Sequence, residues 1–257
     1  MDGLAALRLQ IEWGADEALL DAPADRFAPL PARASSQPAV AAPARPSALV
    51  ALAAGPALAA SAAAGAADLV SLHAALDRFD ACPLRGTASL TVAPSGNPDA
   101  GLVLVAEAPG PEDDRAGQAF SGEAGGQLDR ILLSAGLSRD RLLLALLVPW
   151  RPPGGRAPNE AELALCLPFL HRLLVLTRPR RLVLLGASPL RALVGDENGR
   201  RRPRGKWTEA VIPGLTVPIP ALPMLPPDQW LNSPSNKQAT WADLLSLHSA
   251  DASDSGN

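Results

Sequence analysis

From residue 102 onward, short apolar runs alternate with segments of helical periodicity, and this alternation most constrains the fold. Four apolar runs predict strands, at residues 102–105, 142–148, 181–185 and 216–221. The last run contains prolines, so we expect it at a sheet edge. Four segments predict helices, at residues 126–135, 159–177, 189–194 and 238–248. Strands that alternate with helices build a mainly parallel sheet covered on both faces, so the sequence predicts an α/β fold.

The first 67 residues have a different composition. Apolar residues recur at helical spacing within residues 1–21, which predicts a short amphipathic helix that either docks on the main domain or binds a partner. Residues 22–67 are rich in Ala and Pro, and we expect a disordered linker because they offer little large apolar surface to offset ordering entropy. Asp68 is the expected N-cap of the next helix. Residues 68–250 form the predicted folded domain, and residues 251–257 a disordered tail.

Charge is nearly balanced overall but uneven along the chain. The formal net charge is −3 and the sequence pI is about 5.6, which does not announce a nucleic-acid-binding protein. Residues 172–207 carry ten basic side chains against two acidic ones, whereas residues 107–140 carry seven acidic against three basic. The arginine run at 200–207 therefore fits either a solvated loop or a contact to phosphates. No signal peptide or membrane span is recognisable, and we expect a cytoplasmic protein.

In an open α/β sheet, ligands bind beyond the carboxyl ends of the strands. The loop after the first predicted strand contains Glu107, Asp113 and Phe120, and the following loops contain arginines and amides. A carboxylate can orient a water, an aromatic ring can stack on a base, and arginines can meet phosphates. Each signal is weak alone: the segment also fits a solvated acidic connection, and Phe120 fits a core residue equally well. No catalytic triad, Walker-type loop or dinucleotide-binding loop is present.

Eight short motifs, in order along the chain, resemble those of the uracil-DNA glycosylase superfamily, most closely its family-four, iron–sulfur type. They include Glu107-Ala-Pro-Gly110, Gly117-Gln-Ala-Phe120, Arg151-Pro-Pro-Gly154, Leu185-Gly-Ala187, Arg204-Gly-Lys-Trp207 and Trp241-Ala-Asp-Leu244. The resemblance covers roughly residues 72–247. It implies a three-layer α/β/α sandwich around a short, mainly parallel sheet, in agreement with the alternation of elements.

The resemblance also implies an activity in base-excision DNA repair, namely hydrolysis of the N-glycosidic bond of uracil flipped out of DNA. Glu107 and Asp113 would lie at the water and sugar side of the pocket as catalytic residues. The base would bind against Phe120, Ala108, Pro109 and Gly110. The side chains expected toward DNA are those of Arg151, Arg204 and Lys206.

Two departures concern the half of the pocket that reads the base. Leu146 stands where the family has an Asn that reads the Watson–Crick edge of uracil, and leucine offers neither donor nor acceptor. Leu225 is the nearest match to a late His that donates to the leaving base, and Gln229, Asn232 and Asp228 are the polar residues that could replace these groups. Losing hydrogen-bonding partners can cost about 10⁴–10⁵ in discrimination, and losing one preorganised donor roughly 2.7–4 kcal/mol.

A third departure concerns the cofactor. Family-four members use four cysteines for a 4Fe-4S cluster, but here only Cys82 and Cys166 remain, with Phe79 and Trp150 at the other two positions. A four-iron cluster ordinarily needs four ligands. We therefore expect no cluster and no other metal, with apolar packing around two remnant cysteines.

Three functional hypotheses remain open from the sequence. The chain is either an active glycosylase for uracil or another damaged base, or a catalytically impaired relative that binds DNA or a repair partner, or a nucleotide- or protein-binding module without a DNA role. We expect a monomer that binds DNA and no membrane, with the amino-terminal helix available to a repair protein.

Overall fold

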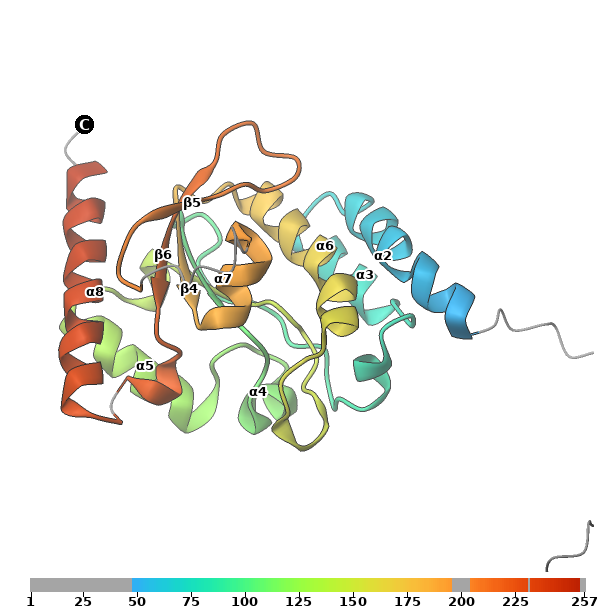
Figure 1. The fold of residues 1–257 in the computed structure, drawn as a ribbon, viewed down its shortest axis with the longest axis horizontal. Helices are drawn as coiled ribbons and strands as arrows, with labels where there is room; N and C mark the ends of the chain where they lie inside the picture. Colours follow the sequence, from blue (N-terminus) through green and yellow to red (C-terminus); the bar gives the residue numbers. More distant parts are fainter. Residues whose placement is uncertain (1–47, 196–203, 231, 255–257) are drawn as a thin grey trace, which may run out of the picture. The chain divides into compact units, whose positions relative to one another are not determined.

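A computed structural model of the chain describes residues 48–195, 204–230 and 232–254, with one six-stranded sheet at its centre (Figure 1). The strand order is β1-β3-β2-β4-β6-β5. The four inner strands are parallel, and β1 and β5 pair antiparallel at the two edges. The predicted α/β fold with a mainly parallel sheet is therefore confirmed.

The strands are β1 Ser95–Gly96, β2 Leu102–Ala106, β3 Leu143–Leu146, β4 Arg181–Leu185, β5 Thr208–Ala210 and β6 Ile219–Met224. The α-helices are α2 Ala48–Ala64, α3 Leu69–Asp77, α4 Pro111–Ala116, α5 Gly122–Ser134, α6 Glu160–Thr177, α7 Ala187–Val194 and α8 Pro234–Asp254. Four short 3-10 helices, η1 to η4, lie at Pro83–Gly86, Arg139–Arg141, Pro153–Gly155 and Pro227–Gln229. No helix in these described ranges is long and apolar enough to cross a membrane.

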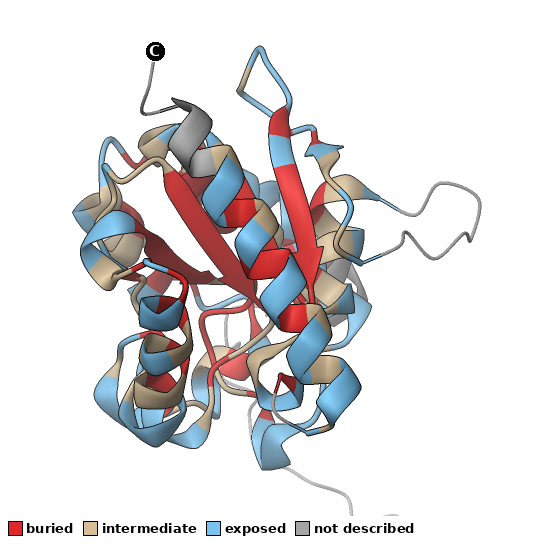
Figure 2. Ribbon diagram, turned by 90° about the vertical axis from the view of Figure 1, so that its left-hand side faces the viewer, coloured by how far each residue is buried: buried red, intermediate tan, exposed pale blue. Residues whose placement is uncertain are grey.

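Alternating side chains of the inner strands supply two separate hydrophobic cores. Val103 and Val105 of β2 join the core that includes residues of α2, α3, α6 and α7. Leu102 and Leu104 join the core that includes residues of α5 and α8. The inner strands are almost entirely buried, and the helices have both buried and exposed residues (Figure 2). This arrangement follows from the period of two along a strand, which sends successive side chains to opposite faces of the sheet.

The predicted linker is wrong over its second part, where the chain forms α2 and packs against α6. Ala59 and Ala63 of α2 are fully or almost fully buried, and a Cβ on Gly55 would lie only 2.6 Å from Leu165 Cδ2. Large apolar side chains are not needed here, because alanine has the highest helix propensity and small residues let two helices approach closely. The predicted amino-terminal helix lies outside the described residues, as does the first part of the linker.

The predicted edge position of the proline-containing strand is also wrong. β6 lies between β4 and β5, and the edge is formed by the three-residue strand β5, which is too short and polar for its pattern to show. A proline removes only its own N–H donor, while its carbonyl still accepts, so β6 keeps its pairing on both sides. At the other end of the domain, α8 continues to Asp254, into the predicted disordered tail.

The two best-marked helix starts are confirmed. Asp68 is the N-cap of α3, where its Oδ1 accepts the Ser71 N–H at 2.7 Å. Asn159 is the N-cap of α6, where its Oδ1 accepts the Glu162 N–H at 2.9 Å. These contacts satisfy backbone donors that have no partner inside the helix.

Candidate functional site

A cavity of about 990 Å3 opens at the carboxyl ends of β2, β4 and β6. Its lining comes from the loops after these strands, from helix α7 and from Phe120. The chain leaves β2 toward α5 on one face and leaves the neighbouring β4 toward α7 on the other, so the two loops diverge. Open α/β sheets place their ligands in the crevice that such divergence creates.

The cavity brings together most of the residues singled out in the sequence. Its lining includes Glu107, Asp113, Phe120, Ala108, Gly110, Arg204, Leu146 and Leu225. Pro109, Arg151 and Lys206 are not part of that lining. The lining residues span more than 100 positions of the sequence, from Ala106 to Gln229, and the parallel sheet brings them together at the carboxyl ends of its strands.

Phe120 lines the cavity in a constrained backbone conformation. Its φ of 55° lies in the left-handed region, which is unusual for a residue other than glycine. Arg139 Nη2 donates to the Phe120 carbonyl at 2.6 Å, and the next amide, of Ser121, donates to Asp113 Oδ1 at 2.6 Å. On the remaining side, a Cβ on Gly125 would lie 1.9 Å from the Phe120 oxygen, so α5 approaches the turn directly. Phe120 is 9% exposed, and it belongs both to the core and to the cavity wall.

The acidic run after β2 is neither a solvated connection nor a cluster of free carboxylates. Asp113 Oδ2 accepts the Gly110 N–H at 2.9 Å, in addition to the bond from Ser121 to Oδ1. Glu112 Oε2 accepts the Glu123 N–H at 2.9 Å at the start of α5. Buried Asp114 accepts both the amide and the hydroxyl of Ser89, at 2.9 and 2.7 Å. Asp113 and Glu112 therefore stabilise the turn that carries Phe120, whereas Asp114 connects the same segment to Ser89.

Glu107 differs from these acidic residues. It lines the cavity half-buried, and its side chain makes no hydrogen bond or ion pair with the residues that the structure describes. Its backbone carbonyl accepts the Val148 N–H at 2.9 Å, which fixes the residue directly after β2. A carboxylate held at this place is available to a water or to a ligand in the cavity.

Part of the cavity wall is apolar, at the two leucines that were expected to lie beside the base. Leu146 at the end of β3 and Leu225 after β6 both line it and pack against the core that contains Phe120. Of the polar residues considered as replacements, Asp228 and Gln229 line the cavity and are exposed, whereas Asn232 is not part of the lining.

Arg191 is a lining residue that the sequence analysis missed. It lies in the last turn of α7, on the helix that starts beyond β4. Its position one helical turn after Ala187 was the available signal, because Ala187 belongs to the loop expected at the site. With Arg204, it gives the cavity two guanidinium groups, which suit an anionic ligand.

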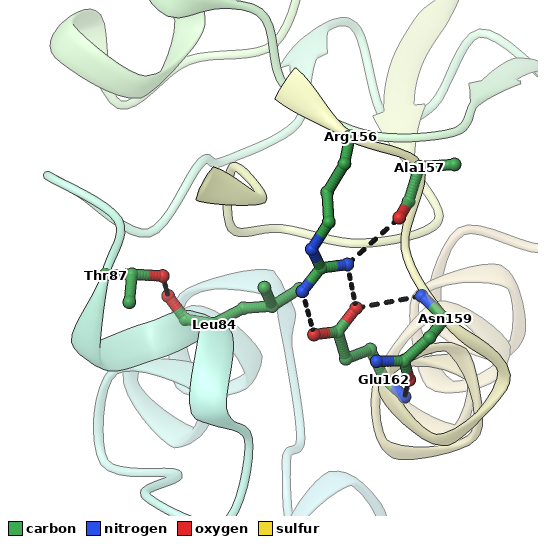
Figure 3. A network of polar contacts seen from close by, with 6 residues as sticks. All are labelled: Leu84, Thr87, Arg156, Ala157, Asn159 and Glu162. Atoms are coloured by element: carbon green, nitrogen blue, oxygen red, sulfur yellow. Dashed lines mark hydrogen bonds and ion pairs between the residues drawn. The ribbon is translucent and has the colours of Figure 1, made fainter. Parts of the chain in front are cut away.

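The loop between β3 and α6 is held by an ion pair between the exposed Arg156 and the buried Glu162 (Figure 3). Arg156 binds Glu162 through both terminal nitrogens, with N–O distances of 2.8 and 2.6 Å. Glu162 Oε2 also accepts the Asn159 N–H at 2.9 Å, which completes a reciprocal capping box. The hydrogen bonds from Arg156 hold the pKa of the Glu162 carboxyl below its ordinary value. This ion pair therefore fixes the end of the loop that leads into α6.

The four positions expected from the resemblance to correspond to cluster ligands lie in one hydrophobic core. Phe79, Cys82, Trp150 and Cys166 are all buried. The Trp150 indole donates to the Thr91 hydroxyl at 3.1 Å. A hydrogen bond between the two thiols, together with burial, raises the pKa of Cys166 well above the usual thiol value. Because the whole chain has only two cysteines, its donor set does not fit a four-iron cluster.

Comparison with known proteins agrees with this geometry. Residues 93–245 match the model of the uracil DNA glycosylase superfamily. A type-4 uracil-DNA glycosylase of Pyrobaculum aerophilum is 34% identical over 157 residues, which cover 59% of this chain and 80% of that protein. Similar enzymes of Thermotoga maritima and Archaeoglobus fulgidus are 37% and 38% identical, over 43% and 41% of this chain and 57% and 53% of theirs.

The family model spans β1 to β6 and the first part of α8, so it includes every strand whose following loop contributes to the cavity. The first of these relatives aligns over four-fifths of its own length. The chain therefore belongs to the uracil-DNA glycosylase superfamily.

Proposed function

We propose that this protein binds DNA with a damaged base flipped into the cavity and hydrolyses the N-glycosidic bond of that base. The observation that carries the proposal is the meeting of Glu107 and Phe120 in one cavity beyond β2 and β4. The family adds the substrate class, since the similar proteins are uracil-DNA glycosylases. A base cannot be reached inside a duplex, so the chemistry requires an extrahelical nucleotide and a pocket large enough to hold it.

In this mechanism the base stacks on the ring of Phe120, a contact worth about 1–3 kcal/mol. The ring does not have to reorganise, because its backbone is already fixed by Arg139, Asp113 and the approach of Gly125. Asp113 therefore acts as a positioning residue rather than as the group that meets the substrate.

Glu107 is the catalytic residue in the proposal. Its carboxylate accepts a proton from a water, and the water oxygen bonds to C1′ of the deoxyribose as the glycosidic bond breaks. The electron pair of that bond leaves with the base, which then takes up a proton. The proposal leaves Glu107 and the water as the reacting groups, because Asp113 is already bonded to two backbone amides.

Uracil itself is a poor substrate on this proposal. Leu146 and Leu225 offer no hydrogen bond to the base, and a site without those bonds loses both discrimination and transition-state stabilisation. The same two leucines favour a second candidate function, in which the chain binds damaged DNA and does not hydrolyse it. The two candidates share the pocket and the flipped base, and they differ only in the final step.

A single-turnover assay separates them. Excess protein is incubated with a labelled duplex that carries one uracil, or one of a panel of damaged bases, and alkali then cleaves the strand at each abasic site. Cleavage that disappears in Glu107→Gln supports hydrolysis. Binding to the damaged duplex without cleavage of any base in the panel establishes the second candidate. Neither binding nor cleavage at low salt would refute both.

A further inference from the structure

Asp243 of helix α8 is a buried carboxylate that the fold leaves poorly paired. The residue is 5% exposed, and its Oδ2 has no hydrogen-bond partner among the described residues. Among the described residues it pairs with Arg204, whose Nε lies 3.7 Å from Oδ2, an ion pair without a hydrogen bond. Burying a charge with incomplete pairing costs stability, so stability does not explain a carboxylate at this position.

Asp243 approaches the loop at residues 204–207 closely because that loop has a glycine at position 205. A Cβ on Gly205 would lie 2.5 Å from Asp243 Oδ1, and the Gly205 φ of +73° is in the left-handed region. Two hydrogen bonds also hold the loop at this contact. The Gly205 N–H donates to the Pro223 carbonyl of β6 at 2.9 Å, and the Trp207 indole donates to the Ser246 hydroxyl of α8 at 3.1 Å.

Arg204 both pairs with Asp243 and lines the cavity. Its side chain is one-third exposed and lines the same cavity as Glu107 and Phe120. Nε is the Arg204 atom that pairs with Asp243, and the guanidinium makes no hydrogen bond with the residues that the structure describes. A guanidinium held at Nε presents its remaining N–H groups as a planar fork that fits two oxygens of a phosphate.

We propose that Asp243 is a positioning residue that holds the Arg204 guanidinium at the rim of the cavity, where it binds a backbone phosphate next to the flipped nucleotide. The inference rests on the proposed function, because the phosphate belongs to DNA bound in the cavity. Asp243 does not touch the DNA, and its effect passes entirely through Arg204.

The test measures binding of a fluorescent duplex with a tetrahydrofuran abasic-site analogue, by anisotropy over a series of salt concentrations. Arg204→Ala is expected to weaken binding about tenfold or more and to reduce the slope of log K against log salt by about one. Arg204→Lys keeps the charge without the fork and is expected to fall between wild type and alanine. Arg178→Ala, at the opposite end of β4, is the control and is expected to bind as wild type does.

Asp243→Asn distinguishes positioning from a structural role. We expect weaker binding together with an unfolding midpoint that is unchanged or raised, and we expect no further loss when it is combined with Arg204→Ala. Wild-type binding by Arg204→Ala, or losses that add in the double variant, would overturn the inference and leave the proposed function intact. If Asp243→Asn does not fold, the Arg204 series with its salt slopes still decides whether the guanidinium binds a phosphate. Absence of any DNA binding by the wild type would overturn both proposals.

Discussion

Two adjacent glycines of α5 should respond to alanine with opposite signs. A Cβ on Gly125 would lie 1.9 Å from the Phe120 oxygen and 2.6 Å from its carbonyl carbon. Backbone would have to move by about 1 Å before the contact reached 3.0 Å, the shortest that real Cβ atoms show. A Cβ on Gly126 would meet only Arg130 Nη1, at 3.8 Å. Both glycines lie inside the helix, so the intrinsic gain from alanine is the same at the two positions.

The magnitudes follow from these contacts. Alanine is better than glycine in a helix by about 0.8–1.0 kcal/mol, so Gly126→Ala is expected to stabilise the protein by about that amount. In Gly125→Ala, overpacking costs about 1–3 kcal/mol and displacement weakens the hydrogen bonds from Arg139 and to Asp113, each worth about 1.5–3 kcal/mol. We expect a net destabilisation of about 2–4 kcal/mol. In a domain of this size each kcal/mol shifts Tm by about 2–4 °C.

Urea unfolding followed by tryptophan fluorescence measures both variants, because Trp150 and Trp230 are almost completely buried. Gly125→Ala should also weaken binding to abasic-site DNA, since the displaced turn carries the ring of Phe120, whereas Gly126→Ala should bind normally. Equal stability of the two variants, at unchanged m-value, would refute the reasoning that the close approach of α5 fixes Phe120.

The remaining predictions concern the apolar wall, two carboxylates and the cluster positions. Leu146→Asn combined with Leu225→His should raise single-turnover uracil excision by at least about 100-fold, and no increase would show that more than these two groups is missing. Because the pKa of Glu162 is lowered, its ion pair stabilises the protein at pH values above the usual glutamate pKa. This stability is lost as the pH falls through the lowered value. Glu162→Gln should therefore make the free energy of unfolding depend less on pH in the acid range. Burial raises the pKa of Asp243, so stability should decline as pH rises from the usual aspartate pKa through the raised value, and Asp243→Asn should remove that decline. Asn159→Ala should cost about 1 kcal/mol in urea unfolding. The purified protein should show no visible absorption, and a brown colour that acid bleaches would contradict the expected absence of an iron–sulfur cluster.

Most of the fold could be predicted because its signals are local. β2 and β4 are continuous apolar runs, and α3 and α6 begin at capping residues whose side chains bind the first free amides. The predictions failed where packing overrides composition. The alanine-rich helix α2 is stabilised by close contact with α6, and β5 exists only because β6 offers an unpaired edge.

The candidate site was predictable in its residue types but not in its roles. Glu107 and Phe120 were expected in the pocket, and both line it. The acidic run from Glu112 to Asp114 gave no sign that its carboxylates bind backbone amides, since partners such as Ser89 are distant in sequence. Arg191 was missed because a lone arginine in a short helix looks like a surface residue.

The sequence by itself determined the alternation of the inner strands with their helices, the family and the apolar side chains at Leu146 and Leu225, because these depend on residue identity and spacing along the chain. Only the tertiary structure decided which charges are free to act. Glu107 and Arg204 line the cavity, whereas Asp113 is bonded to backbone amides and Asp243 is buried and pairs with Arg204. Burial and hydrogen-bond partners come from segments that meet only when the sheet forms, and they separate a carboxylate that can orient water from one that holds the pocket in shape.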